Sequence, residues 1–281
     1  GDNHAASIRC MSSKSNLAGM NPVEYPEMAG VEQGVTVKIP QKELREMISR
    51  VVFAIATDES RQILTGCLLE VTASEARMVA LDGFRLAIQK VFQPFELPAG
   101  TETLKAVIPG RVLNELSKIL AEEDEFCTLL IDKTRMQASF GNTKLSTVLL
   151  AGEYIDYRRI LPLSFKTVVK ADRVGVQSAI DRASLMAREG KNNLIRMSMN
   201  GETLSITSNA ELGDVLEELD ASLTGDPIEI AFNAKYITDV IRNITDDELC
   251  MHFNSNVSPC VVSPIDGDQY LYLILPVRVF S

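Results

Sequence analysis

Four segments of the chain carry apolar residues at the spacing of an amphipathic helix. In the first of them, Leu44, Met47, Ile48 and Val51 recur every three or four positions, so they share one face. Pro40 suits the first turn of a helix, because its missing amide hydrogen is not needed there. The helices predicted on this basis span residues 39–55, 109–120, 172–186 and 233–244.

Shorter apolar runs bounded by turn-forming residues predict strands between these helices. Asp82–Gly83, Gly141–Asn142 and Asn200–Gly201 are dipeptides typical of tight turns, and the last is a strong hairpin signal. The predicted strands span residues 65–71, 77–80, 86–91, 127–132, 136–140, 145–150, 194–199, 203–208, 250–254, 260–264 and 270–277.

The order of elements repeats along the chain. Asp124-Glu125-Phe126-Cys127 reappears 123 residues further on as Asp247-Glu248-Leu249-Cys250, and a predicted helix precedes each tetrad. This interval is far longer than the period of a solenoid, so it indicates duplicated domains. A partial further copy opens the chain. The predicted domains are the tail of a first copy in residues 1–34, a second copy in 35–163 and a third in 164–281.

The composition agrees with about two folded domains and narrows the class of protein. The chain has 281 residues, of which 46% are hydrophobic and 23% charged, and these values exclude a disordered or collagen-like chain. The net charge of −10 argues against a protein that coats polyanions generally, but it is compatible with a local basic surface. No apolar run is long enough to span a bilayer, and the polar N-terminus does not resemble a signal peptide. We therefore expect a soluble, cytoplasmic protein.

Candidate catalytic and metal-binding residues are scarce. The five cysteines form no C-x-x-C pair, and the two histidines, His4 and His252, stand in no metal-ligand spacing. The nucleotide-binding patterns G-x-x-x-x-G-K-[ST] and G-x-G-x-x-G do not occur. Acidic clusters at 122–125 and 246–248 precede strands in both copies and are typical of solvated loops. The sequence thus predicts no catalytic residue, no metal and no cofactor.

Basic residues occupy matching positions in the two copies. Arg111 and Lys118 are seven residues apart on one predicted helix, so they share a face, and Lys235 and Arg242 repeat this spacing on the corresponding helix. On a single helix this pattern indicates only a solvated surface. Its repetition favours a surface that faces phosphates, where Lys and Arg give affinity without sequence preference.

Two apolar segments have two interpretations of equal weight. Residues 81–86 place apolar side chains around a turn, where a chain usually meets water, and residues 270–280 form a dense apolar strand near the C-terminus. Both segments can belong to the core. Together they can also form an exposed apolar groove for a partner peptide.

Five segments together resemble a known family, the bacterial sliding clamps (the β subunit of DNA polymerase III holoenzyme). They are Leu81-Asp82-Gly83-Phe84-Arg85-Leu86-Ala87, Ile108–Leu116, Asp156-Tyr157-Arg158-Arg159-Ile160-Leu161-Pro162, Phe232–Tyr236 and Tyr272–Arg278. The similarity runs in register along nearly the whole chain. The family has three similar domains per chain, and this sequence looks like the second and third with the tail of the first.

The resemblance implies an α+β fold of repeated DNA-clamp domains, with antiparallel sheets outside and paired helices inside, and a function that is not enzymatic. Two full-length chains pair head to tail in a ring that encircles duplex DNA, independently of its sequence, and tethers the polymerase. DNA polymerase III, clamp-loader subunits and other proteins with clamp-binding peptides are the implied partners. The implied DNA-facing residues are Arg111, Lys118, Lys235 and Arg242.

The resemblance also implies a pocket between the second and third domains that receives a short hydrophobic peptide. Phe84 and Ile155 stand where histidine and proline are common in the family, and both keep apolar bulk. We expect Arg85 and Arg159 to frame the rim. Carried over position by position, the pocket comprises Leu64, Leu81, Gly83, Phe84, Arg85, Leu86, Ile155, Arg159, Ile160, Val257, Pro259, Leu273, Ile274, Leu275, Pro276, Val277 and Arg278.

Two further function classes stay open on the residues alone. A hydrolase or transferase would need two acids that converge in a cleft, one of them with a strongly raised pKa. A peptide-binding scaffold without DNA would lack a basic concave surface on its paired helices. For the clamp, we expect the 281-residue chain by itself to form no closed ring, since only about 34 residues of the first copy are present.

Overall fold

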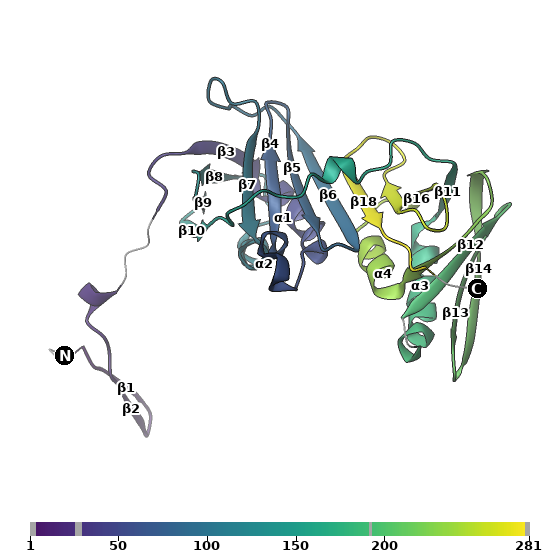
Figure 1. Cartoon of the computed structure of the whole chain (residues 1–281). Coiled ribbons are helices and arrows are strands. Elements are labelled where there is room, and N and C mark those ends of the chain that lie inside the picture. The colour runs from purple at the N-terminus through teal and green to yellow at the C-terminus, as the bar shows by residue number, and fades with distance from the viewer. Residues whose placement is uncertain (1–3, 26–29, 191–192, 279–281) are drawn as a thin grey trace.

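The computed structural model describes residues 4–25, 30–190 and 193–278. An elongated body holds most of them, and an N-terminal hairpin lies apart from this body (Figure 1). The hairpin consists of β1 (Ala6–Cys10) and β2 (Ser13–Leu17), and both strands are exposed along their whole length. A short 3-10 turn, η1 (Pro22–Glu24), follows it.

The first half of the body, called the middle unit from here on, contains two helices and eight antiparallel strands. Helices α1 (Gln41–Ser49) and α2 (Gly110–Ile119) pack against each other. The strands are β3 (Val35–Pro40), β4 (Gly66–Val71), β5 (Glu75–Leu81), β6 (Arg85–Phe92), β7 (Leu104–Pro109), β8 (Phe126–Ile131), β9 (Arg135–Phe140) and β10 (Thr143–Val148). They pair in the orders β10-β9-β8-β3 and β6-β5-β4-β7. Two 3-10 segments, η2 (Val52–Ala54) and η3 (Glu59–Thr65), connect α1 to β4.

The second half, called the C-terminal unit, repeats this arrangement. Its helices are α3 (Arg173–Glu189) and α4 (Ala234–Arg242), which also pack against each other. Its strands are β11 (Thr167–Asp172), β12 (Leu194–Asn200), β13 (Thr203–Ala210), β14 (Gly213–Gly225), β15 (Ile228–Asn233), β16 (Glu248–Phe253), β17 (Cys260–Ser263) and β18 (Tyr270–Ile274). In both units a strand and a helix precede four strands, a second helix and three strands, so the duplication seen in the sequence is a duplication of fold.

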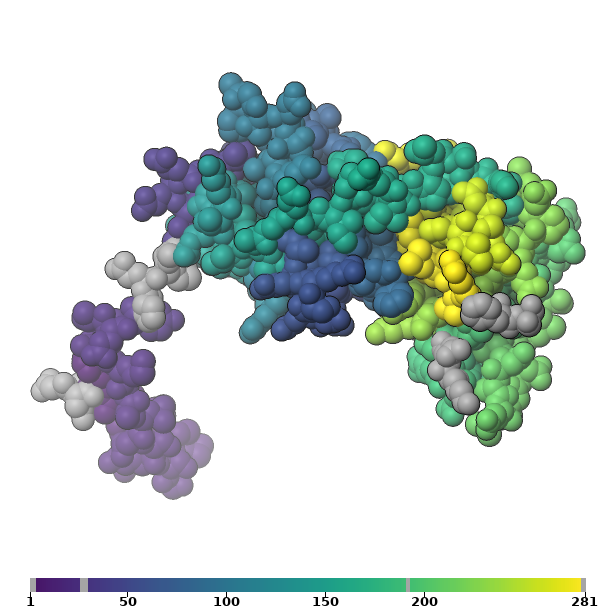
Figure 2. All heavy atoms as spheres, in the orientation of Figure 1, coloured from purple at the N-terminus to yellow at the C-terminus, as the bar shows by residue number. Residues whose placement is uncertain are grey.

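The two units share one sheet. Strand β18, the last strand of the described residues, pairs antiparallel with β6 of the middle unit, from Tyr270 opposite Gln89 to Ile274 opposite Arg85. This pairing joins both units into a sheet of twelve strands. Figure 2 shows the yellow atoms of the C-terminal residues against the blue atoms of the middle unit. A connector, residues 149–166, runs between the units and contains the 3-10 turn η4 (Tyr157–Arg159).

The main core lies between the sheets and the helices. The apolar face of α2 buries Leu113 and Leu116, and that of α4 buries Ile237, Val240 and Ile241. The opposite faces of these helices carry polar side chains, as the helical period predicts. A second, smaller cluster forms where the connector crosses the sheet. The predicted α+β class, with antiparallel sheets and paired helices, is thereby confirmed.

The prediction of a helix over residues 39–55 is wrong at both ends. Ile39 and Pro40 belong to β3, where Val37 and Ile39 alternate with exposed residues and are buried. Pro40 caps α1 rather than lying in its first turn, and the helix ends at Ser49 before the 3-10 segment η2. The apolar run from Val51 to Ile55 continued the helical period, which concealed this break.

The sequence-based prediction also omitted five strands of the two units, namely β3, β7, β11, β14 and β15, and made the last strand too long. Strand β14 is the longest of the described strands, with 13 residues that alternate mostly between half-buried and exposed. Strand β18 ends at Ile274, so the predicted strand 270–277 loses its last three residues. Beyond it, the backbone amide of Leu275 donates to the carbonyl oxygen of Phe84, and that of Val277 to the carbonyl oxygen of Ala231.

Candidate DNA-facing and peptide-binding surfaces

The predicted DNA-facing residues lie exposed on two helices, one from each unit. Arg111 and Lys118 project from α2, and Lys235 and Arg242 from α4. Both helices lie along the lower side of the body in the view of Figure 1. The structure thus brings the four cations to corresponding places on corresponding helices, as the duplicated spacing predicts.

These four cations differ in their partners. Lys118 forms an ion pair with Glu115 at 2.9 Å, and Arg242 forms one with Asp181 at 2.8 Å. Within the described residues, Arg111 and Lys235 have no side-chain ion pair. Because an ion pair must be broken or shared before its cation can contact a phosphate, Arg111 and Lys235 are the more available pair.

The four packed helices carry a charge of opposite sign to the rest of the chain. They contain nine Lys or Arg residues and six Asp or Glu residues, which gives +3, whereas the whole chain carries −10. A polyanion is therefore attracted to these helices and repelled by the acidic remainder of the chain.

The sequence analysis missed two basic residues on α1. Lys42 and Arg45 line a hollow of about 570 Å³ between α1 and α2, together with Lys118 and Glu122. Arg45 forms an ion pair with Glu122 at 2.7 Å. Lys42 and Arg45 lie on the polar face of the first predicted helix, so they could have been found from the sequence. They were missed because the corresponding helix of the second copy has no cations at the matching positions.

Several of the predicted peptide-pocket residues gather in the second apolar cluster, called the connector cluster from here on. Its buried members are Leu64, Leu68, Val79, Leu81, Leu86, Ile88, Val107, Tyr157, Val261 and Leu273. Ile155 and Leu275, two further predicted residues, pack against it. Phe84, Ile160 and Val257 lie within four positions of a cluster member along the chain and are exposed, with 55%, 40% and 56% of their surface accessible. Exposed apolar side chains beside a buried cluster are typical of a docking surface.

Other predicted pocket residues lie elsewhere. Ile274 alternates with Leu273 on β18, so its side chain is fully buried in the main core on the opposite face of the sheet. Gly83, Arg159 and Arg278 are exposed, and Pro259, Pro276 and Val277 are half-buried. Ile274 is therefore a core residue, and its inclusion in the pocket is corrected.

The prediction that Arg85 frames the rim is corrected as well. Its side chain is only 6% exposed and its guanidinium donates to the carboxylates of Asp82 and Asp239, at 3.0 and 2.6 Å, and to the carbonyl oxygen of Phe53 at 2.6 Å. It also lies over the rings of Phe53 and Tyr236, 5.2 and 4.9 Å from their centroids. Since Asp239 and Tyr236 belong to α4, Arg85 ties the turn of the middle unit to a helix of the C-terminal unit.

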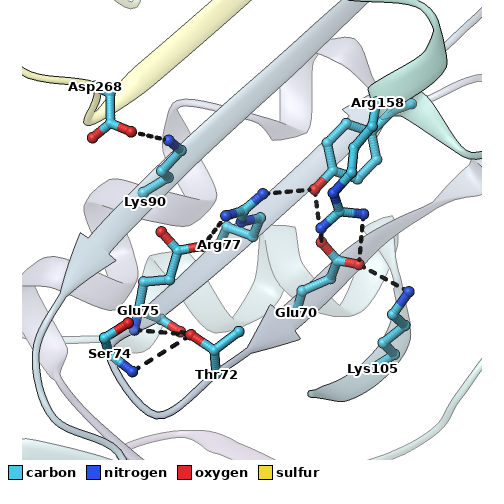
Figure 3. A network of polar contacts seen from close by, with 10 residues as sticks. Glu70, Thr72, Ser74, Glu75, Arg77, Lys90, Lys105, Arg158 and Asp268 are labelled. Atoms are coloured by element: carbon cyan, nitrogen blue, oxygen red, sulfur yellow. Dashed lines mark hydrogen bonds and ion pairs between the residues drawn. The ribbon is translucent and has the colours of Figure 1, made fainter. Parts of the chain in front are cut away.

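A buried carboxylate that the sequence analysis did not single out holds the connector. Glu70 on β4 has 2% of its surface exposed. It accepts hydrogen bonds from the Tyr157 hydroxyl at 2.7 Å and from both terminal nitrogens of Arg158 at 2.7 and 3.3 Å, and it lies 3.2 Å from the Lys105 ammonium. Figure 3 shows Glu70 between Arg158 and Lys105. Burial alone would raise the pKa of Glu70, but these hydrogen bonds hold it below its ordinary value.

Among residues 4–25, 30–190 and 193–278, no group of three His, Cys, Asp or Glu side chains is placed to hold a metal ion. In the same ranges no helix is long and apolar enough to cross a membrane.

Comparison with known proteins gives the family. Residues 38–156 match the central domain of the DNA polymerase III beta subunit, and residues 158–278 match its C-terminal domain. The beta sliding clamp of Staphylococcus epidermidis is 33% identical over 270 residues, which cover 95% of this chain and 71% of that protein. The crystal structure of the DNA polymerase sliding clamp from Bacillus subtilis matches with a TM-score of 0.93 and 33% identity, over all of this chain and 74% of that one. A putative DNA polymerase III beta subunit from Eubacterium rectale matches with a TM-score of 0.92 and 28% identity, over 99% of this chain and 75% of that one. The chain therefore belongs to the DNA polymerase III β subunit family, the bacterial sliding clamps, which are processivity factors and not enzymes.

Proposed function

We propose that the helices α1 to α4 line one part of a ring that encircles duplex DNA in the cytoplasm, without sequence preference. The observation that carries this proposal is the +3 charge of the four helices on a chain of charge −10. A modest excess of cations attracts the phosphates weakly, which suits a ring that must slide. Arg111 and Lys235 supply the main contacts, and Lys118 and Arg242 add to them.

The proposed DNA contacts are tested by salt dependence. We expect the 281-residue chain to bind duplex DNA weakly, and replacing Arg111, Lys118, Lys235 and Arg242 with Ala to make the slope of log K against log salt shallower by at least about 2. A matched control removes four cations from strands and their flanks, namely Lys38, Lys144, Lys166 and Lys170, and should leave the slope nearly unchanged. Equal effects of the two sets would contradict the assignment of the lining.

Internal repetition supports the three-domain, head-to-tail ring. Strand β18 at the end of the C-terminal unit pairs with β6, the edge strand of the middle unit. Strand β10 holds the position in the middle unit that β18 holds in its own, and within the described residues its outer edge has no strand partner. We propose that a preceding domain pairs with β10, as the middle unit pairs with β18. In the whole protein, two such three-domain chains form the ring, and in each chain the second domain corresponds to residues 35–163 and the third to residues 164–281 of this sequence.

We further propose that the connector cluster and its exposed neighbours bind the clamp-binding peptides of DNA polymerase III, clamp-loader subunits and other partners. Phe84, Ile160 and Val257 offer apolar surface at the joint of the two units, where ligand sites are frequent. Apolar burial at about 25 cal/mol per Å² supplies most of the affinity. Arg159, exposed on the connector, is the rim cation in place of Arg85.

The peptide surface is tested with Leu275, which packs against the connector cluster and is only half-buried. Leu275→Lys places an ammonium against the peptide, and we expect binding of a clamp-binding peptide to fall below detection in calorimetry. Lys144→Met, at an exposed position of β10, is the control and should leave the affinity unchanged. A folded wild-type chain that ignores the peptide would show the assignment to be wrong.

A further inference from the structure

The connector carries part of the proposed peptide surface but has little regular structure of its own. Ile155, Arg159 and Ile160 lie on it, and its one helical element is the three-residue turn η4. Backbone amides tie the ends of the connector to the sheets, at Leu149, Leu150 and Lys166. Between these ends, a segment without a ladder of backbone hydrogen bonds depends on side-chain contacts with its surroundings. The contacts between the connector and the sheet therefore decide where these three residues stand.

Two adjacent residues make most of the connector's side-chain hydrogen bonds to the sheet, and Tyr154 adds one from its hydroxyl to the carbonyl oxygen of Val79 at 3.2 Å. Tyr157 is buried, with 1% of its surface exposed, and its hydroxyl donates to Glu70 and accepts from Arg77 at 3.1 Å. Arg158 meets the same carboxylate with both terminal nitrogens, and its guanidinium lies 4.7 Å from the Tyr157 ring. Tyr157 and Arg158 of the connector thus bind the same carboxylate, that of Glu70 on β4.

Glu70 is the centre of this arrangement. A buried carboxylate without partners is costly, so the position requires the cations and the hydroxyl that surround it. Two of its partners, Tyr157 and Arg158, belong to the connector, whereas Lys105 belongs to β7 and is 60% exposed. The contacts to the connector are therefore the ones that fix its course, and the contact to Lys105 adds charge balance.

We propose that Glu70 is a positioning residue for the peptide-binding surface. Through Tyr157 and Arg158 it holds the connector so that Ile155 packs on the connector cluster and Ile160 stands exposed beside it. Glu70 itself touches no peptide, because it lies buried on β4 beneath the connector. This inference rests on the proposed peptide-binding function.

The test measures binding of a fluorescein-labelled clamp-binding peptide from a bacterial replicative polymerase. Glu70→Gln keeps the shape of the side chain but removes its charge, and Tyr157→Phe removes one hydroxyl. We expect the first to weaken peptide binding about tenfold and the second about threefold, because charge-assisted bonds are the stronger. Lys105→Met, the matched control, removes a cation from the same carboxylate but keeps the bonds of Glu70 to Tyr157 and Arg158, and the affinity should stay within about twofold.

A second measurement separates positioning from loss of stability. Amide hydrogen exchange across residues 152–161 should accelerate in Glu70→Gln and stay unchanged in Lys105→Met. Met197→Ala, in the buried core of β12, lowers stability far from the connector and should leave peptide affinity unchanged.

The outcomes are distinct. If wild type binds the peptide and Glu70→Gln binds it equally well, the positioning role is overturned while the proposed function stands. An equal loss of affinity in Met197→Ala also overturns the positioning role, since a general loss of stability then explains the weaker binding. If Glu70→Gln does not fold, Tyr157→Phe decides by the same criterion. Failure of the wild type to bind removes both the proposed function and this inference.

Discussion

Replacing Arg85 with Met discriminates between a residue at the rim of a binding surface and a residue that joins two units. The substitution keeps the apolar stem but removes three hydrogen bonds, to Asp82, Asp239 and the carbonyl oxygen of Phe53. Removing one partner of a buried ion pair costs about 3–5 kcal/mol. Asp82 retains the backbone amides of Phe84 and Arg85 as partners, and Asp239 is 28% exposed, so water compensates part of the loss. We therefore expect the lower end, about 3 kcal/mol.

Urea unfolding followed by far-ultraviolet circular dichroism measures this loss, because the chain has no tryptophan to report by fluorescence. Arg159→Met is the control, as Arg159 is exposed, and it should change the free energy of unfolding by less than about 0.5 kcal/mol. A double-mutant cycle with Asp239→Asn should give a coupling energy of about 1–3 kcal/mol. A loss below about 1 kcal/mol for Arg85→Met, or no coupling to Asp239, would refute the reasoning and return Arg85 to the rim.

Three further predictions concern single side chains. The free energy that Glu70 contributes should be fully present above the ordinary carboxyl pKa of 4.5 and lost as pH falls through its lower folded-state pKa, so the stability difference between wild type and Glu70→Gln should narrow in acid titrations. Gly225→Ala should prevent folding of the C-terminal unit, since φ is +102° and the new Cβ would overlap the carbonyl oxygen of Lys166. Gly83→Ala is the control, because φ is similar at +93° but the new Cβ would meet open space, and it should lower the stability by only about 1 kcal/mol in thermal unfolding. Phe84→Ala should cost about 1 kcal/mol of stability in the same assay, because it removes a ring stacked 5.4 Å from that of Tyr236.

Local periodicity predicted much of the fold, and it failed where tertiary contacts decide. The helices around 110–119, 173–189 and 234–242 follow from apolar spacing alone. The sequence did not predict strand β14, because Leu216 is exposed and Glu217 takes a half-buried position. Arg182 pairs with Glu217 there at 2.6 Å. This exchange of an apolar and a charged residue breaks the alternation that signals a strand.

The peptide pocket was predictable only as far as its residues resemble the family. The exposed cations on α2 and α4 followed from repetition within the sequence. The burial of Arg85 did not, because its partner Asp239 lies 154 residues further along the chain. Glu70 gave no signal at all, since an acidic residue in an apolar strand looks like an exposed one until Tyr157 and Arg158 are seen beside it.

The shared sheet has a mechanical consequence. Five residue pairs join β18 to β6, and their backbone hydrogen bonds follow one another along the two strands. A force that pulls the units apart along the strand direction loads these hydrogen bonds in shear, so they must break together and not one after another. Such a joint yields at higher force than one made of side chains alone. When the ring opens to admit DNA, the strain should therefore collect where two chains meet, and this chain should move as a single stiff lever.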